Sequence, residues 1–245
     1  MRYYIYDGSF QGLLTAIYES YYRSAKPEDI LPRHRFTGNL FAQVEEIDTD
    51  EIKADKVFQA IKNKISPTAL RRVFYAFLSE ITGVELLIYR YLQLGWKVGR
   101  DIDRHLTDHR VAMIHKISQK VGLEKHRLLG LIRFRKLKGE IYYAPIEPDY
   151  NIVSLVAPHF ARRLSDQNWV IHDRKRDVAV LYNQKEWVMT VLDPGRDYVL
   201  AEEEKYCQQM WKNYFRSASV PGRTNLKLQR QFMPTRYWRY LIEKQ

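Results

Sequence analysis

The sequence predicts an α+β fold, with a helical N-terminal half and a small antiparallel sheet flanked by helices in the C-terminal half. Two patterns support this class. In the first half, apolar residues recur every three or four positions, as on one face of a helix. In the second half, short β-like stretches alternate with turn-forming residues, as in antiparallel strands. We expect one domain over residues 1–245, within which residues 50–132 could form a helical subdomain.

The first elements are a strand and a capped helix. Tyrosine and isoleucine at residues 2–6 favour a short strand. The turn Asp7-Gly8-Ser9 follows, and its Asp or Ser can cap the helix that begins at Phe10. Apolar residues keep helical spacing as far as Tyr21, and a second strand is expected at residues 41–47.

The next segments are helical. Asp50 is expected to begin one helix, and Ser66-Pro67 is typical of an N-cap followed by the first helical turn. The apolar stripe from Phe74 to Leu92 predicts one long helix of about six turns, closed by Gly95 and Gly99.

The C-terminal half begins with two short helices and a hairpin. The helices are expected at residues 108–121 and 123–132, separated by Gly122, and the hairpin pairs residues 133–138 with 141–146. Further elements are helices at 151–163 and 202–217 and strands at 169–172, 178–182 and 187–192.

The chain is basic, and its charges are segregated. It carries 40 Lys and Arg against 29 Asp and Glu, a net charge of +11. Cations outnumber acids ten to two over residues 104–138 and eight to one over residues 212–245. Residues 45–55 show the reverse, with six acids and one lysine. A basic face of this kind favours a polyanionic partner.

Cysteine content and hydropathy exclude several classes of protein. The single cysteine, Cys207, excludes an intrachain disulfide and a multi-cysteine metal site built by this chain alone. No apolar run approaches the roughly 20 residues of a membrane span, and the first residues lack the apolar region of a signal peptide. We expect a cytoplasmic protein with no membrane partner, no metal and no other cofactor.

The segment from Leu226 to Leu241 interleaves cations with aromatic rings. Guanidinium groups neutralise phosphates and exposed rings stack on bases, so this mixture suits a nucleic-acid surface. The alternative is a C-terminal helix whose rings pack on the core. The residues predicted to contact nucleic acid here are Arg230, Arg236, Tyr237, Trp238 and Arg239.

A second basic segment lies in the predicted strand at residues 133–138. Arg133, Arg135 and Lys136 could lie along a phosphate backbone. The alternative is an exposed edge strand whose charges protect it from aggregation.

The candidates for catalysis are histidines and acids near predicted turns. His172 is followed by Asp173, and a His beside an Asp can serve as a general base. Glu147 and Asp149 flank a proline, and His159 lies in a predicted helix. Because no nucleophile accompanies them, a structural role for the histidines is the alternative.

Several motifs resemble a bacterial family known as "probable DNA metabolism protein", classed as domain of unknown function 4130. They include Leu128-Leu-Gly-Leu-Ile-Arg-Phe-Arg135, Tyr143-Ala-Pro-Ile-Glu-Pro-Asp149 and Arg230-Gln-Phe-Met-Pro-Thr-Arg-Tyr-Trp238. The resemblance spans nearly the whole chain. It implies a role in DNA repair or modification beside a radical SAM protein, and some members of the family are fused to a uracil-DNA glycosylase-like domain. It implies no catalytic residues.

We therefore expect a DNA-binding accessory protein that delivers DNA to a radical SAM partner enzyme. One alternative is a nucleic-acid-processing enzyme, such as a glycosylase or nuclease, that uses the candidate histidines and acids. Another is an interaction module whose basic face binds an acidic protein. The sequence leaves the strandedness of the DNA and the oligomeric state open.

Overall fold

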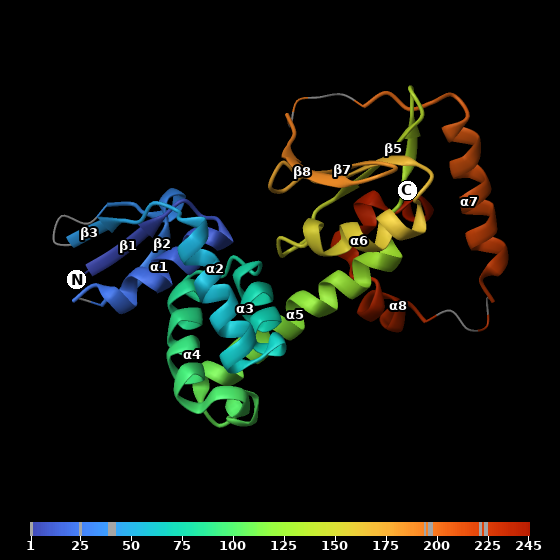
Figure 1. Cartoon of the computed structure of the whole chain (residues 1–245). Coiled ribbons are helices and arrows are strands. Elements are labelled where there is room, and N and C mark those ends of the chain that lie inside the picture. The colour runs from blue at the N-terminus through green and yellow to red at the C-terminus, as the bar shows by residue number, and fades with distance from the viewer. Residues whose placement is uncertain are drawn as a thin grey trace. The chain divides into compact units, whose positions relative to one another are not determined.

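The computed structural model confirms the α+β class, with two small sheets among many helices (Figure 1). It describes residues 2–24, 26–38, 43–193, 195, 198–220, 222 and 225–245. The chain forms two compact units, an N-terminal unit, Met1–Gly122, and a C-terminal unit, Leu123–Gln245. Each unit is described by itself.

The N-terminal unit contains a three-stranded parallel sheet. Its strands are β1 (Arg2–Tyr6), β2 (Asp29–Pro32) and β3 (Gln43–Glu46), in the order β2-β1-β3. The predicted strand at 2–6 is confirmed. The strand expected at 41–47 is present from Gln43, and residues 41 and 42 lie outside the described residues.

Side-chain caps start three helices of this unit where the sequence predicts them. The Ser9 hydroxyl accepts the backbone N–H of Gly12 at 2.9 Å and caps α1 (Phe10–Tyr22). Asp50 caps α2 (Glu51–Ala60), which continues into the π-helical turn η2 (Ile61–Ile65). Ser66 caps α3 (Pro67–Phe77) through the N–H of Ala69.

The prediction of a single long helix from the apolar stripe is wrong. The stripe belongs to two helices, α3 and α4 (Val84–Val98), and a turn separates them. Glu80 and Gly83 in this turn have positive φ angles of 53° and 78°. Both helices bury their apolar side chains in the same core, so the stripe continues across the turn. A 3₁₀ helix, η3 (Gly99–Arg104), follows α4.

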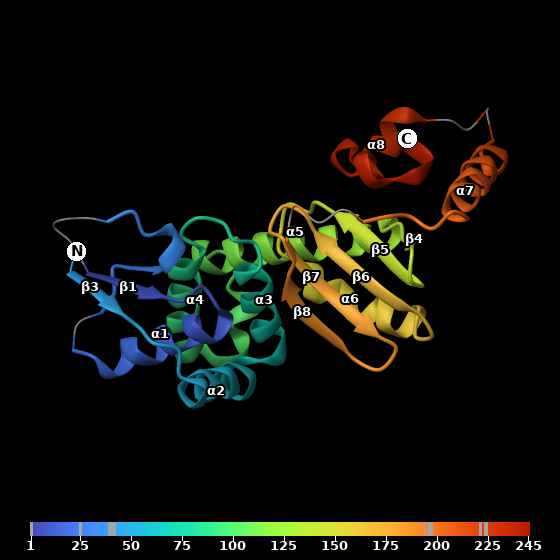
Figure 2. The same cartoon turned by 90° about the horizontal axis from the view of Figure 1, so that it is seen from above.

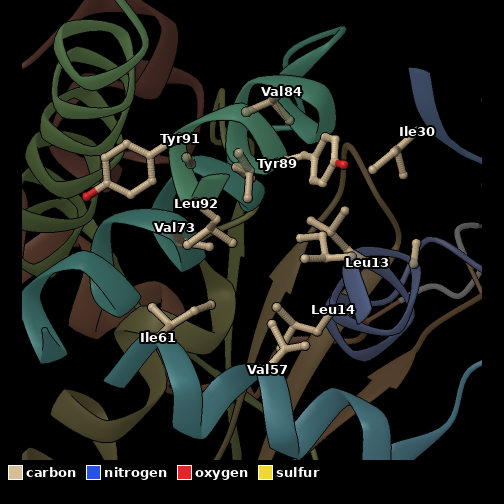
Figure 3. Close-up of a cluster of buried hydrophobic side chains, with 14 of the residues drawn as sticks. Leu13, Leu14, Ile30, Val57, Ile61, Val73, Val84, Tyr89, Tyr91 and Leu92 are labelled. Carbon is tan, nitrogen blue, oxygen red and sulfur yellow. The ribbon is translucent and has the colours of Figure 1, made fainter. Parts of the chain in front are cut away.

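One core holds the N-terminal unit together (Figure 3). Leu13 and Leu14 of α1, Val57 of α2, Ile61 of η2 and Leu92 of α4 point toward one another and are buried. Burial of apolar side chains from each of these elements is the main favourable term in the stability of this unit.

The predicted break at Gly122 is also wrong. A single helix, α5 (His109–Leu131), runs through this position. A glycine inside a helix costs only about 1 kcal/mol relative to alanine, too little to end a 23-residue helix.

The C-terminal unit contains a five-stranded sheet in the order β4-β5-β6-β7-β8 (Figure 2). Its strands are β4 (Arg135–Leu137), β5 (Ile141–Ile146), β6 (Asn168–Asp173), β7 (Val178–Asn183) and β8 (Trp187–Val191). The antiparallel pairing predicted for this sheet holds for every neighbouring pair except β5 and β6, which are parallel. The chain crosses between these two strands through α6 (Val153–Arg163), a connection that parallel strands require.

Helix α6 covers one face of this sheet (Figure 2). Phe160 of α6 contacts the rings of Trp169 and Phe134, and Trp169 is almost fully buried. The chain then forms α7 (Glu204–Ala218), α8 (Leu226–Phe232) and the 3₁₀ helices η5 (Thr235–Tyr240) and η6 (Ile242–Lys244). Among the described segments, no helix combines the length and apolar character needed to cross a membrane.

Candidate functional site

The parallel pairing of β5 and β6 brings two groups of predicted catalytic residues to one edge of the sheet. Glu147 and Asp149 follow the end of β5, and His172 and Asp173 end β6. Arg176 links the two strand ends. Its guanidinium pairs with Asp173 at 2.9 Å and donates to the backbone carbonyl of Asp149 at 2.8 Å.

Asp173 has a structural role in this arrangement. Its side chain is fully buried, and besides the Arg176 ion pair it accepts the backbone N–H of Lys175 at 2.9 Å. Burial raises the pKa of Asp173. One carboxylate oxygen of Asp173 pairs with Arg176 and the other accepts the N–H of Lys175, so Asp173 fixes the turn after β6.

A buried carboxylate that the sequence analysis did not single out organises the loop after β5. Glu124 of α5 is 2% exposed. Its two oxygens accept the backbone N–H groups of Asp149 at 2.8 Å and Tyr150 at 2.9 Å. One of them also accepts the hydroxyl of Tyr237 at 2.5 Å. The available signal in the sequence is the position of Glu124, an isolated acid within a long run of cations.

The C-terminal 3₁₀ helix η5 pairs with the same loop. Arg236 forms an ion pair with Asp149 at 3.0 Å, and Arg239 forms one with Glu147 at 3.1 Å. Tyr240 donates its hydroxyl to Glu147 at 2.5 Å. Three of the residues predicted to bind nucleic acid, Arg236, Tyr237 and Arg239, therefore meet two of the acids predicted for catalysis, Glu147 and Asp149, in one cluster. We call it the η5 cluster, and its members are Glu124, Glu147, Asp149, Arg236, Tyr237, Arg239 and Tyr240.

The two arginines of the η5 cluster remain accessible. The side chain of Arg236 is 45% exposed and that of Arg239 is 68% exposed. In a 3₁₀ helix, residues three apart lie on the same side, so both guanidinium groups face the same region. The guanidinium of Arg239 lies 5.5 Å from the ring centre of Tyr240, and burial of Tyr240 together with its hydrogen bond to Glu147 raises its pKa to about 12.

The two predicted stacking rings are engaged within the chain. Tyr237 is 4% exposed, and its hydroxyl is bound to Glu124. Trp238 donates its indole N–H to the carbonyl of Met233 at 2.9 Å, and the ammonium of Lys244 lies 4.6 Å from its ring centre. In this conformation Tyr237 presents no face to a nucleobase.

The cations of the hairpin are also held by partners within the unit. Arg133 forms a bidentate pair with Glu243, with N–O distances of 2.6 and 3.2 Å, and its guanidinium lies 5.2 Å from the ring centre of Trp211. Lys136 lies between Glu140 at 2.7 Å and Glu203 at 3.0 Å.

The remaining predicted residues have less defined surroundings. Arg135 approaches the carbonyl of Tyr240 at 3.5 Å. Arg230 is exposed on α8 and forms no ion pair with a described residue. His159 contacts the ring of Phe160 edge-on, and within the described residues no interaction joins it to the η5 cluster.

His172 is buried beside two tyrosines on the sheet face opposite α6. Its Nδ1 lies 2.8 Å from the hydroxyl of Tyr143, whose ring stacks on that of Tyr198 at 4.0 Å. Its Nε2 has no hydrogen-bond partner among the described residues, and the nearest carboxylate, Asp177, is 3.9 Å away. Burial, and then the charge of Arg174, lower the pKa of His172, which favours a neutral imidazole.

A family model described as a domain of unknown function, DUF4130, matches residues 82–243. The chain belongs to the DUF4130 family. The match confirms the resemblance at the level of this family and includes every residue of the η5 cluster. No curated protein matches the chain.

Proposed function

We propose that this DUF4130 protein is a DNA-binding accessory protein of a DNA repair or modification system that acts with a radical SAM partner enzyme. The observation that supports DNA binding is the exposed pair Arg236 and Arg239 on one side of η5. The family resemblance supports the repair role and the partner.

The ion pairs of these arginines do not prevent phosphate binding. Exposed ion pairs contribute only about 0–1 kcal/mol, so a phosphate can compete with Glu147 and Asp149 for the guanidinium groups. The pairs also hold both side chains in place, which lowers the conformational entropy lost when a phosphate binds. Lys227 and Arg230 of α8 are exposed and precede η5 in the chain, and they add further positive charge.

Binding of fluorescent single- and double-stranded oligonucleotides across a salt series tests the proposal. We expect affinity to fall steeply with salt, because bound phosphates release their counterions. The double variant Arg236→Ala/Arg239→Ala should bind more weakly, and the slope of log affinity against log salt should decrease by about two.

The matched control removes the same charge elsewhere. Arg90→Ala/Arg100→Ala replaces two exposed arginines of the N-terminal unit and should leave the salt slope unchanged. Circular dichroism establishes that each variant is folded. If the η5 variant binds DNA as the natural chain does, η5 is not the DNA-binding segment.

One observation favours a second function, that of a nucleic-acid-processing enzyme. The buried Nε2 of His172 has no partner among the described residues, and it belongs to the strand that ends beside Glu147 and Asp149. A neutral imidazole can accept a proton from a substrate. Turnover of defined DNA substrates by the pure protein, lost in His172→Asn and Asp149→Asn, would support this function. Absence of turnover with and without divalent metal would exclude it for those substrates.

A further inference from the structure

The N-terminal unit carries aromatic rings that its core does not bury. Tyr21 and Tyr22, in the last turn of α1, are 46% and 73% exposed. Tyr18 of α1 and Trp96 of α4 pack against the core but are only partly buried. Adjacent exposed rings are an unfavourable surface for an isolated protein and are typical of an interaction site.

Ring packing holds these side chains in defined positions. Tyr18 and Tyr22 are four residues apart on α1, and their rings stack at 4.5 Å with an interplanar angle of 28°. The ring of Tyr21 meets that of Trp96 edge-on at 5.2 Å. Because Tyr22 is 73% exposed, its ring is accessible to a further flat ring.

The rings line a groove together with two lysines. Its volume is about 330 Å³, and its aromatic and charged lining consists of Tyr18, Tyr21, Tyr22, Trp96, Lys56 and Lys64. None of the described residues that line it is acidic.

The two lysines of the groove form no ion pair with a described carboxylate. Lys56 of α2 lies 5.7 Å from the ring centre of Tyr18, and neither it nor Lys64 forms an ion pair with a described residue. The neighbouring Lys53 differs, because it pairs with Glu19 at 2.8 Å. Lys64 belongs to the π-helical turn η2, a geometry that often occurs at functional sites.

We propose that this groove binds single-stranded nucleic acid. Bases would stack on the exposed ring of Tyr22, and phosphates would lie near Lys56 and Lys64. Flat rings and uncommitted cations are the two components of a single-strand site, and base stacking tolerates any sequence. A duplex keeps its bases stacked on each other and cannot offer their faces to the groove. An acidic peptide would satisfy the lysines but would leave the rings exposed.

The groove is a site additional to the η5 cluster. Five of its six named residues precede residue 82, where the DUF4130 match begins. The two sites can therefore be tested by separate substitutions.

Fluorescence anisotropy with the full chain and a labelled oligothymidine tests the groove. Tyr22→Ala should weaken binding of the single strand about tenfold, because one stacking contact is lost. Tyr22→Phe keeps the ring and should bind as the natural chain does. Lys56→Ala/Lys64→Ala should reduce the salt slope by about two. An oligomer of abasic sites, which has phosphates without bases, should bind more weakly than oligothymidine.

Two controls separate stacking in the groove from other effects. Tyr206→Ala removes a tyrosine that is 70% exposed on α7 and should leave binding unchanged. Duplex binding should be the same in Tyr22→Ala and in the natural chain. Folded Tyr22→Ala with unchanged single-strand affinity, or no single-strand binding by the natural chain at low salt, would overturn the proposal.

The same titrations distinguish this proposal from the proposed function. If Tyr22→Ala loses single-strand affinity while Arg236→Ala/Arg239→Ala has no effect on any DNA, the groove is the binding site and η5 is not. The reverse result excludes the groove and retains η5.

Discussion

The hydroxyl of Tyr237 donates a 2.5 Å hydrogen bond to the carboxylate of Glu124, a residue 113 positions earlier in the chain. The bond fastens η5 to α5. The same carboxylate holds the loop after β5 through the N–H groups of Asp149 and Tyr150. One buried acid therefore positions both the loop acids and the basic segment of the η5 cluster.

Loss of this carboxylate should destabilise the protein. Glu124→Ala would leave two partly buried N–H groups of the loop and the buried hydroxyl of Tyr237 without their acceptor, at a cost of about 1–3 kcal/mol for a fully buried group. We expect the free energy of unfolding, measured by urea denaturation, to fall by about 3 kcal/mol or more. Tyr237→Phe should cost about 1–2 kcal/mol. The double variant should lose less stability than the sum of the losses in the two single variants. If the losses are simply additive, the hydrogen bond contributes nothing to stability.

The two arginine–carboxylate pairs Arg133–Glu243 and Arg239–Glu147 should differ in their effect on stability. The side chain of Glu243 is fully buried, so Arg133→Met would leave an unpaired buried charge and should cost about 3–5 kcal/mol. Arg239→Met breaks an exposed pair and should cost less than about 1 kcal/mol. Thermal or urea unfolding of the two variants measures the difference. Equal losses would contradict the burial argument.

Glu243 should also contribute to the loss of stability in acid. Burial by itself would raise its pKa, but the hydrogen bonds from Arg133 and from the indole of Trp211 outweigh burial and lower it. A lowered carboxyl pKa stabilises the folded state above the unfolded value of about 4.3. That stability is lost as pH falls through the folded pKa. Unfolding of Glu243→Gln and the natural chain between about pH 6 and about pH 3 should show the smaller pH dependence in the variant.

His172 should reduce stability at mildly acidic pH. Its pKa is lowered in the folded state, whereas an unfolded histidine titrates near about 6.5. Below that value the unfolded chain binds more protons, so the free energy of unfolding falls until pH passes the folded pKa. His172→Asn should show a flatter profile than the natural chain between about pH 8 and about pH 5. Identical slopes would mean that the pKa of His172 is the same in the folded and unfolded states, which would contradict the prediction.

Two glycines should respond to alanine in opposite directions. A Cβ at Gly95 would lie 2.6 Å from Cδ1 of Ile65 and 3.0 Å from Cδ1 of Ile102, so Gly95→Ala should destabilise the protein by about 1–3 kcal/mol. Among the described residues, no atom outside the neighbouring backbone of α5 lies within 4 Å of a Cβ at Gly130, and Gly130→Ala should stabilise by about 0.5–1 kcal/mol. Denaturant midpoints of the two variants compare these effects. Partial rescue of Gly95→Ala by Ile65→Val would confirm overpacking as the cause.

The sequence determined the features that depend on neighbouring residues. The caps at Ser9, Asp50 and Ser66 could be predicted because a cap bonds an N–H group only three residues away. The hairpin at residues 133–146 could be predicted because its turn and its alternation are both local.

Only the tertiary structure decided the features that depend on residues far apart in the sequence. The stripe from Phe74 to Leu92 contains a turn that the pattern does not reveal, because α3 and α4 both pack on one core. Gly122 does not end α5, because the free-energy cost of one glycine inside a helix is too small. The parallel pairing of β5 with β6 follows from the crossover through α6, and it brings the candidate acids and the candidate histidine to the same ends of two adjacent strands.

The candidate site shows the same division. Composition alone predicted a segment of cations and rings at the C-terminus, and Arg236 and Arg239 are indeed exposed there. Composition could not show that Tyr237 is buried, or that Arg133 is paired with an acid 110 residues later. A side chain's exposure and its charge partner depend on residues far away in the chain, and only the folded structure brings those residues together.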